Sequence, residues 1–162
     1  MSDGLIQPEA TAAIGRTVEQ RTGTVYKKEF QRWAAAVGDL NPLYFDEKVA
    51  RAHGYRDVIM PPMFLGHVTS TFVLLSALRP DGTAERGSVD VPLPARRMAG
   101  GEETEFYAPV FAGDVLSSTR RLAGLEEKHG RSGDFVLVNW ETTYLNQDEE
   151  QVAKTVNLVI AR

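Results

Sequence analysis

The sequence contains no cysteine, only three histidines and no long uninterrupted apolar run. Without cysteine the chain can form neither a disulfide framework nor a thiolate metal site or nucleophile, and the redox compartment is left open. No run approaches the roughly 18 apolar residues that a membrane-spanning helix needs. Residues 1–13 include Asp3 and Glu9 and lack an apolar core, so we expect no secretory signal. We therefore expect a cytoplasmic protein that does not enter a membrane.

An excess of positive charge is also missing. The chain has 18 Lys and Arg against 22 Asp and Glu, which gives a net charge of −4, so a nucleic-acid partner is not expected. Its 162 residues, 43% of them hydrophobic, fit one domain with a substantial core. We expect a flexible N-terminal tail over residues 1–13 and a single domain over residues 14–162.

The histidines do not form a metal-binding pattern. They stand at His53, His67 and His129, and no spacing suggests ligands on one element, so no metal site is expected. His67 has two interpretations: it faces a ligand channel, or it packs in the core or an interface. We keep it as a candidate substrate-binding residue.

The first half of the chain carries helix signals. Residues 17–26 alternate loosely and predict a strand, and residues 27–37 have apolar side chains at helical spacing. Gly38 follows that helix where a C-terminal cap belongs. Asp46 is placed to cap a second helix over residues 47–52.

A long apolar segment follows two prolines. Pro61 and Pro62 suit a helix start, where a missing N–H costs nothing, and the turn residues Pro80-Asp81-Gly82 stop it. The segment from Met63 to Leu78 is apolar on most sides, which predicts a helix buried on most faces.

The second half carries strand signals. Residues 103–107, 115–127, 135–145 and 152–160 predict strands separated by short turns, and Val89, Val91 and Leu93 predict a weak strand before them. Three long strands joined by tight turns form an antiparallel meander. The pattern predicts an α+β fold in which a curved antiparallel sheet encloses the long helix.

Two motifs resemble a known family. The first is Gly38-Asp39-x-Asn41-Pro42-Leu43-x-x-Asp46, followed by Ala52-x-Gly54-Tyr55 and Val58-Ile59-x-Pro61-Pro62-x-Phe64; the second is Glu105-Phe106-x-x-Pro109-Val110-x-x-Gly113-Asp114-x-Leu116. Together they resemble the MaoC-like hydratases and dehydratases, which have the hot-dog fold. The resemblance is closest to the N-terminal MaoC dehydratase type, including the non-catalytic partner subunits of two-chain dehydratases and enoyl-CoA hydratases.

The resemblance implies reversible addition of water to a 2-enoyl thioester, giving a (3R)-hydroxyacyl thioester, with a CoA or acyl-carrier thioester as substrate and no cofactor or metal. It assigns the family aspartate to Asp39, the adjacent asparagine to Asn41, and to Ser70 a serine that commonly orients the aspartate. Tyr44 stands where the family histidine belongs. Pro62 stands where a glycine usually offers its N–H to the thioester carbonyl.

These two departures change the chemistry. A phenol with an ordinary pKa of about 10 is a poor general base near neutral pH, although it can donate a hydrogen bond. Proline has no N–H, so Pro62 cannot contribute the oxyanion contact, whose loss typically costs about 10²- to 10³-fold in rate. The amide of Met63, at the start of the predicted helix, is the candidate replacement.

Each candidate residue also has a purely structural interpretation. Asp39 and Asn41 suit an Asx-type turn after the helix, and Tyr44 suits packing with its hydroxyl satisfied. Arg96 and Arg97 are candidates for holding the phosphates of the carrier, although adjacent arginines on a loop are usually just solvated.

Three functions remain open. The chain is a self-sufficient hydratase that uses Asp39, or it is a subunit that forms the acyl-binding half while a second MaoC-like chain brings an intact Asp and His pair. A hot-dog acyl-CoA thioesterase is the third, but the Gly-Asp-x-Asn-Pro motif speaks against it. Because hot-dog domains bury an exposed sheet edge by pairing, we expect a homodimer or a heterodimer.

Overall fold

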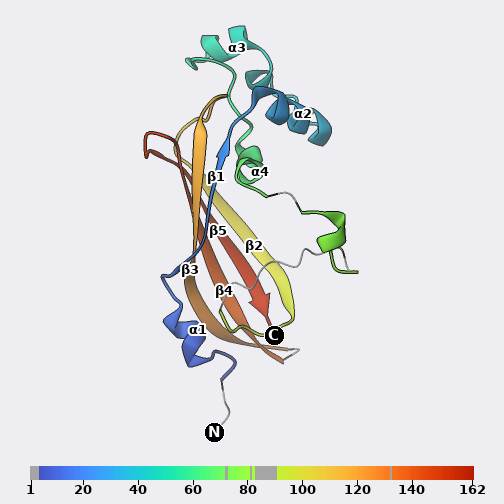
Figure 1. Cartoon of the computed structure of the whole chain (residues 1–162), viewed down its shortest axis with the longest axis vertical. Helices are drawn as coiled ribbons and strands as arrows, with labels where there is room; N and C mark the ends of the chain where they lie inside the picture. Colours follow the sequence, from blue (N-terminus) through green and yellow to red (C-terminus); the bar gives the residue numbers. More distant parts are fainter. Residues whose placement is uncertain (1–3, 72, 81, 83–90, 132) are drawn as a thin grey trace.

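An antiparallel sheet of five strands runs through the length of the molecule, with the strand order β1-β3-β4-β5-β2 (Figure 1). The computed structural model describes residues 4–71, 73–80, 82, 91–131 and 133–162. The strands are β1 (Thr17–Thr24), β2 (Arg97–Phe106), β3 (Val115–Gly130), β4 (Gly133–Leu145) and β5 (Gln151–Ala161). The predicted meander is confirmed, because β3 pairs with β4 and β4 pairs with β5, both antiparallel.

The helices are short and gather at the two ends of the sheet (Figure 1). They are α1 (Pro8–Ala12), α2 (Lys27–Val37), α3 (Glu47–Ala52) and α4 (Leu65–Val68), with 3-10 turns η1 (Pro42–Tyr44), η2 (Pro62–Phe64) and η3 (Leu75–Ala77). The predicted α+β class and the bounds of α2 and α3 are confirmed. Within the described ranges, no helix has the length and apolar character needed to cross a membrane.

Two predicted caps are present in α2 and α3. Gly38 ends α2 in the left-handed region, with φ of 78°, a conformation that costs glycine little. Asp46 Oδ1 accepts from the backbone N–H groups of Lys48 at 2.8 Å and Val49 at 3.2 Å. These caps fix where the loop between the two helices begins and ends.

The N-terminal residues are better ordered than the sequence predicts. The expected flexible tail over residues 1–13 is wrong for its second half, because residues 8–12 form α1. Pro8 occupies the first turn, where its missing N–H is harmless, and Ala10 and Ala13 are fully buried. Small side chains let this helix lie close against the sheet.

The inner face of the sheet, which the helices contact, is apolar at both ends and polar between them. Because alternate residues of a strand share a face, Val138, Thr142 and Tyr144 of β4 point to the same side. Val138 belongs to the α1 cluster, an apolar group that includes α1, and Tyr144 belongs to the α4 cluster, which includes Phe64 and Leu65. The inner face between these clusters carries Ser118, Arg120, Thr142, Thr155, Asn157 and Glu102.

The predicted long helix from Met63 to Leu78 is wrong. The helical stretch comprises η2 and α4 and ends at Val68, and the described residues from 69 to 80 add only η3. The hydroxyl and the N–H of Ser70 both donate to the carbonyl of His67, at 2.9 Å and 3.3 Å. Ser and Thr side chains compete in this way with helical hydrogen bonds, and Thr69 and Thr71 are β-branched as well.

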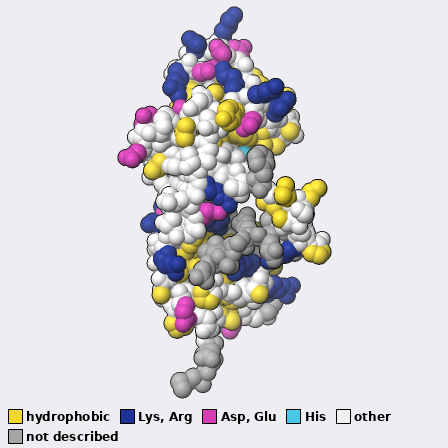
Figure 2. Space-filling model, in the orientation of Figure 1, with side chains coloured by type: hydrophobic (Ala, Val, Ile, Leu, Met, Phe, Trp, Pro, Cys, Tyr) yellow, Lys and Arg dark blue, Asp and Glu magenta, His cyan; other side chains and the backbone are white. Residues whose placement is uncertain are grey.

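The end of this segment does not dock on the sheet. Leu74 and Leu75 are 73% and 86% exposed, and apolar side chains gather on the projecting segment at the right of the molecule (Figure 2). The middle of the inner face is not open for docking, because Ser118, Thr142 and Thr155 there are already buried.

Two strand predictions also change. Val89 lies outside the described residues, and Val91 and Leu93 are in irregular backbone, so the predicted weak strand is wrong where it is described. Pro92 and Pro94 have no N–H to donate to a ladder. Conversely, β2 begins at Arg97 rather than at residue 103, because β5 pairs with it along its whole length.

Gly23 of β1 offers a test of how α4 is seated. A Cβ added at Gly23 would lie 1.8 Å from the carbonyl oxygen of Val68 at the end of α4. Gly23→Ala must therefore push α4 away from β1, and we expect it to lower the free energy of unfolding by about 1–3 kcal/mol, as overpacking does. Urea denaturation measures the loss. Gly66→Ala within α4 is the control, because nothing lies within 4 Å of its Cβ; equal losses in both variants would contradict the contact.

Candidate active site

The loop after α2 brings three of the predicted site residues together. The N–H of Asp39 donates to the carbonyl of Ala34 at 2.9 Å, which turns the chain at the end of the helix. Asn41 Oδ1 accepts from the N–H of Leu43 at 3.1 Å, so the Asx-type contact is present and starts η1. This turn places Tyr44 next to Asp39 and Asn41.

Tyr44 is buried and remains protonated at neutral pH. Burial of its hydroxyl is the main cause that raises its pKa above the ordinary 10.0, and the negative charge of Asp39 raises the pKa further. A hydrogen bond with Asn41 lowers the pKa, whereas a hydrogen bond with Asp39 raises it. The phenol lies close enough to Asp39 for the carboxylate to raise its pKa, and it cannot remove a proton from water near neutral pH.

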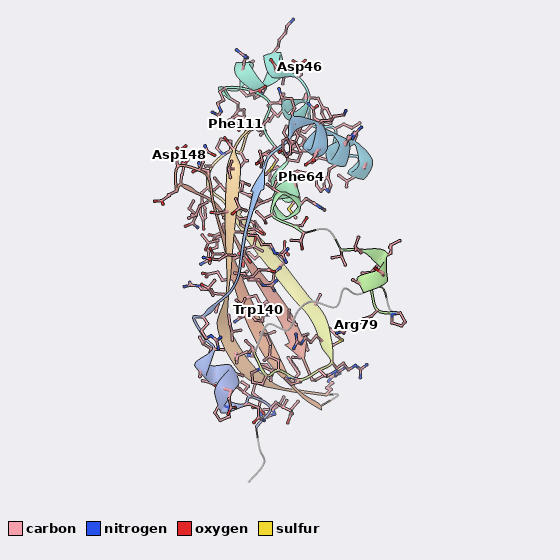
Figure 3. The ribbon with its side chains drawn as sticks, in the orientation of Figure 1. Asp46, Phe64, Arg79, Phe111, Trp140 and Asp148 are labelled. Atoms are coloured by element: carbon pink, nitrogen blue, oxygen red, sulfur yellow. The ribbon has the colours of Figure 1, made fainter. Side chains whose placement is uncertain are left out.

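Ser70 and His67 have contacts of their own. The Ser70 hydroxyl donates to the carbonyl of His67 rather than to Asp39, so the predicted role of Ser70 in orienting the aspartate has no contact that supports it. The His67 ring stacks on Phe64 with centroids 5.4 Å apart and lies 5.8 Å from Trp33. His67 thus packs in an aromatic group at the end of the sheet where Phe64 lies (Figure 3).

An apolar pocket of about 260 Å³ opens between two segments of chain. One wall comes from the segment before and within η2 and α4, and the other from the end of β2, the loop that follows it and β5. The lining residues are Tyr55, Ile59, Met60, Pro62, Leu65, Phe106, Tyr107, Ala108, Pro109, Val110, Val152 and Ala153. Such a lining suits the hydrocarbon part of a ligand.

Pro62 is the one predicted site residue in this lining, and Met63 is not part of it. Met63 is 61% exposed. The helical stretch that starts at Pro62 ends at Val68, so the expected support from a long helix dipole is wrong. The pocket therefore has an apolar wall where the resemblance implies an amide donor.

Asp39, Asn41 and Tyr44, which we call the Asp39 group, lie next to the pocket. One layer of side chains separates the two. Tyr44 packs with Ile59 in the Tyr44 cluster, an apolar group that also contacts Tyr55 and Phe111. Ile59 and Tyr55 in turn line the pocket. Asp39 itself is exposed and does not line the pocket.

Arg96 and Arg97 lie at the opposite end of β2 from the pocket residues Phe106 and Tyr107. At about 3.3 Å per residue the strand separates them by roughly 30 Å. The backbone of Arg96 pairs with that of Arg162. Their predicted phosphate contact stays a prediction, and a metal site finds no support either, because the described residues contain no group of three or more His, Cys, Asp or Glu placed to hold an ion.

Sequence reasoning missed most of the pocket. Tyr55, Ile59, Phe106 and Val110 all fall within or beside the two motifs, so a signal was present. Their spacing does not say that the two motifs face each other, because that contact depends on the backbone bond from Met60 N–H to the Val110 carbonyl, at 2.8 Å.

Comparison with known families settles the class of protein. Residues 12–155 match the sequence model of a family described as "FAS1-like, dehydratase domain region". The chain belongs to this dehydratase family. The resemblance to MaoC-like hydratases and dehydratases is thereby confirmed.

Two relatives show how far the similarity of this dehydratase domain extends. A UPF0336 protein of Streptomyces griseus is 33% identical over 151 residues, which cover 92% of both chains. A probable enoyl-CoA hydratase alpha subunit of Thermomonospora curvata is 29% identical over 154 residues, which cover 88% of this chain and 47% of that protein. The chain thus spans about half the length of the second relative.

Solved structures show the same fold. The ChsH1-ChsH2 complex from Mycobacterium tuberculosis contains a chain that superposes with a TM-score of 0.74 at 22% identity, covering 93% of this chain and 85% of that chain. The predicted hot-dog fold of MaoC-like proteins is confirmed by this similarity.

The contact between Tyr44 and Asp39 can be measured by alkaline absorbance titration. Subtracting the Tyr44→Phe titration from that of the wild type isolates this phenol, whose pKa we expect above 10. The same subtraction is made with Asp39→Asn and the double variant Asp39→Asn, Tyr44→Phe. We expect it to give a lower pKa for Tyr44, because a nearby negative charge is removed. Asp46→Asn is the control, because the Asp46 carboxylate caps α3, and it should leave the pKa of Tyr44 unchanged. An unchanged midpoint in Asp39→Asn would show that the carboxylate does not face the phenol.

Proposed function

We propose that this chain is one subunit of a (3R)-specific enoyl-thioester hydratase, or 3-hydroxyacyl-thioester dehydratase. In this role it binds the acyl part of the thioester while a second MaoC-like chain supplies the Asp and His pair. The observation that supports this most directly is the pairing of Asp39 with a buried, protonated Tyr44 at the place of the family histidine.

Hydration of a 2-enoyl thioester adds a water oxygen to C3 and a proton to C2. One group must take a proton from water, another must return one, and a donor must stabilise the charge on the thioester oxygen. Asp39 can accept a proton, but Tyr44 stays protonated near neutral pH, and Pro62 brings no N–H. These residues therefore supply only part of the machinery.

The pocket next to this group supports the binding half of the proposal. Most of its lining side chains are apolar, and Ile59 and Tyr55 connect it to the Asp39 side. An alkyl chain in the pocket would leave its thioester near the η2 turn. The carrier is CoA or an acyl-carrier protein, and the proposal needs no cofactor.

The proposed partner is a second hot-dog chain. β2 is an edge strand of the sheet, and nine of its ten residues are exposed, which leaves a long row of backbone groups open to pairing. The alpha-subunit name of the Thermomonospora relative and the two-chain ChsH1-ChsH2 complex support such an arrangement. We expect at least a dimer, and a monomer by light scattering would contradict this.

An activity assay separates this proposal from a self-sufficient hydratase. The chain is assayed with crotonyl-CoA and a longer enoyl-CoA, alone and mixed with a MaoC-like chain that contains Asn-Pro-x-His. We expect the chain alone to be slower than the mixture by roughly 10²- to 10⁴-fold, the usual contribution of general acid and base groups. Asp39→Asn should leave the rate of the mixture nearly unchanged.

The outcome that would overturn the proposal is equally specific. A chain that hydrates crotonyl-CoA alone, and loses this activity in Asp39→Asn but not in the control Asp46→Asn, is a self-sufficient enzyme. The exposed position of Asp39, open to water, is the observation that favours this second candidate.

A further inference from the structure

A group of three side chains behind the pocket belongs neither to the pocket lining nor to the Asp39 group. Arg56 donates from Nη2 to Asp114 Oδ1 at 2.8 Å, and its guanidinium lies 4.3 Å from the centroid of the Phe111 ring. Asp114 Oδ2 accepts from the N–H of Phe111 at 2.8 Å. We call Arg56, Phe111 and Asp114 the clamp, because they join two segments that are far apart in sequence.

The clamp lies at the base of both walls of the pocket. Arg56 lies between Tyr55 and Ile59 of one wall, and Phe111 directly follows Val110 of the other. The backbones of Ile59 and Phe111 form a β-bridge between these walls. Figure 3 places Phe111 at the end of the sheet nearest α3. A change in the clamp therefore changes how far apart the walls stand.

Burial makes the clamp stiff. The Asp114 side chain is 9% exposed, whereas that of Arg56 is 64% exposed. A carboxylate buried to this extent needs its cation and hydrogen-bond donors, so removing Arg56 leaves a poorly compensated charge that must move toward water. The backbone on both sides is also held, because Val25 N–H donates to the Asp114 carbonyl at 2.9 Å. Asp114 and Phe111 belong to the same loop, so a movement of the Asp114 side chain is passed to Phe111 through their hydrogen bond.

The other side of the Arg56 segment is anchored separately. Asp57 accepts from Lys27 Nζ at 2.9 Å and from the N–H of Val58 at 2.7 Å. This hydrogen bond from Lys27 is the main cause that lowers the pKa of Asp57. The segment before the pocket wall is thus fixed to α2 through Asp57 and to the opposite wall through Arg56. Loss of the Arg56 contact leaves the Asp57 anchor and the Ile59–Phe111 β-bridge in place, so the walls stay joined and only their spacing can change.

We propose that Arg56 is a positioning residue for the acyl pocket, which acts through Phe111 and Asp114 to set the separation of its two walls. This inference rests on the proposed function, because it takes the alkyl chain of the thioester as the occupant. Close walls contact every methylene of that chain, and a gap of 0.5–1 Å forfeits about a quarter to a half of the dispersion energy of each contact. Arg56 thereby controls how much affinity each added methylene contributes.

The test measures binding against chain length. Butanoyl-, hexanoyl- and octanoyl-CoA are titrated into the full chain by calorimetry, since saturated thioesters bind without reacting. For the wild type we expect log affinity to rise with chain length. Arg56→Met keeps an apolar stem over Phe111 but loses the charge, and we expect the slope to fall by about a quarter to a half. Arg56→Lys keeps a cation for Asp114 and should restore most of the slope.

The matched control is Arg51→Met on α3. Arg51 has the same exposure as Arg56, 65% against 64%, but pairs with Glu47 at 3.9 Å, within its own helix. For Arg51→Met, the slope of log affinity against chain length should equal that of the wild type. Loss of folded protein would lower the apparent stoichiometry for all three thioesters equally and leave the slope unchanged, so the slope separates positioning from stability. If Arg56→Met does not fold, Phe111→Leu replaces it and should lower the slope in the same way.

A further variant keeps the failure of this inference distinct from that of the proposed function. Ala108→Phe fills the pocket and should abolish the dependence on chain length. If Ala108→Phe binds the three thioesters as the wild type does, the alkyl chain does not occupy the pocket. The proposed acyl-binding role and this inference would then both be wrong. The inference alone would be overturned if Ala108→Phe loses the dependence on chain length and Arg56→Met keeps the wild-type slope. The same conclusion follows if Arg51→Met changes the slope as much as Arg56→Met does.

Discussion

The pairing of β3 with β4 is the interaction on which the rest of the structure depends. The two strands stay in antiparallel register from Ser117 opposite Leu145 to Gly130 opposite Gly133, with one shift between Leu122 and Gly124. β1 adds to the free edge of β3, and β5 adds to the free edge of β4. The α1 cluster and the α4 cluster both contain residues of this hairpin, so neither end of the sheet has a core without it.

The side-chain pattern of that hairpin decides where helices can pack. Its inner face is apolar near each end and polar in the middle, where Arg120 lies with its guanidinium 5.0 Å from the ring centroid of Trp140. Helices therefore settle at the ends, α1 at one and α2, α3 and α4 at the other (Figure 1). The candidate site forms at the second end because the Asp39 loop and the walls of the pocket meet there.

The candidate site is divided between two neighbouring places. Asp39 and Tyr44 form a polar pair on one side of Ile59, and the apolar pocket opens on the other. A hydratase needs a base, a donor for the thioester oxygen and a binding surface for the acyl chain, and the apolar pocket is the feature that the proposal assigns to the last of these. A dehydratase-family scaffold with an apolar pocket, and with Tyr44 and Pro62 where the resemblance implies a histidine and a glycine, fits the proposed subunit role.

Local chemistry determined much of this protein from the sequence by itself. The caps at Gly38 and Asp46, the bounds of α2 and α3, and the long strands of the meander follow from contacts between near neighbours, which spacing encodes directly. Tertiary structure alone decided the rest. Whether residues 63–78 form one helix depends on the surface beneath them, and the pocket depends on the meeting of Met60 with Val110, fifty positions apart. Neither is fixed by neighbours in the chain, because the free energy of such contacts comes from surfaces that exist only after the sheet has formed.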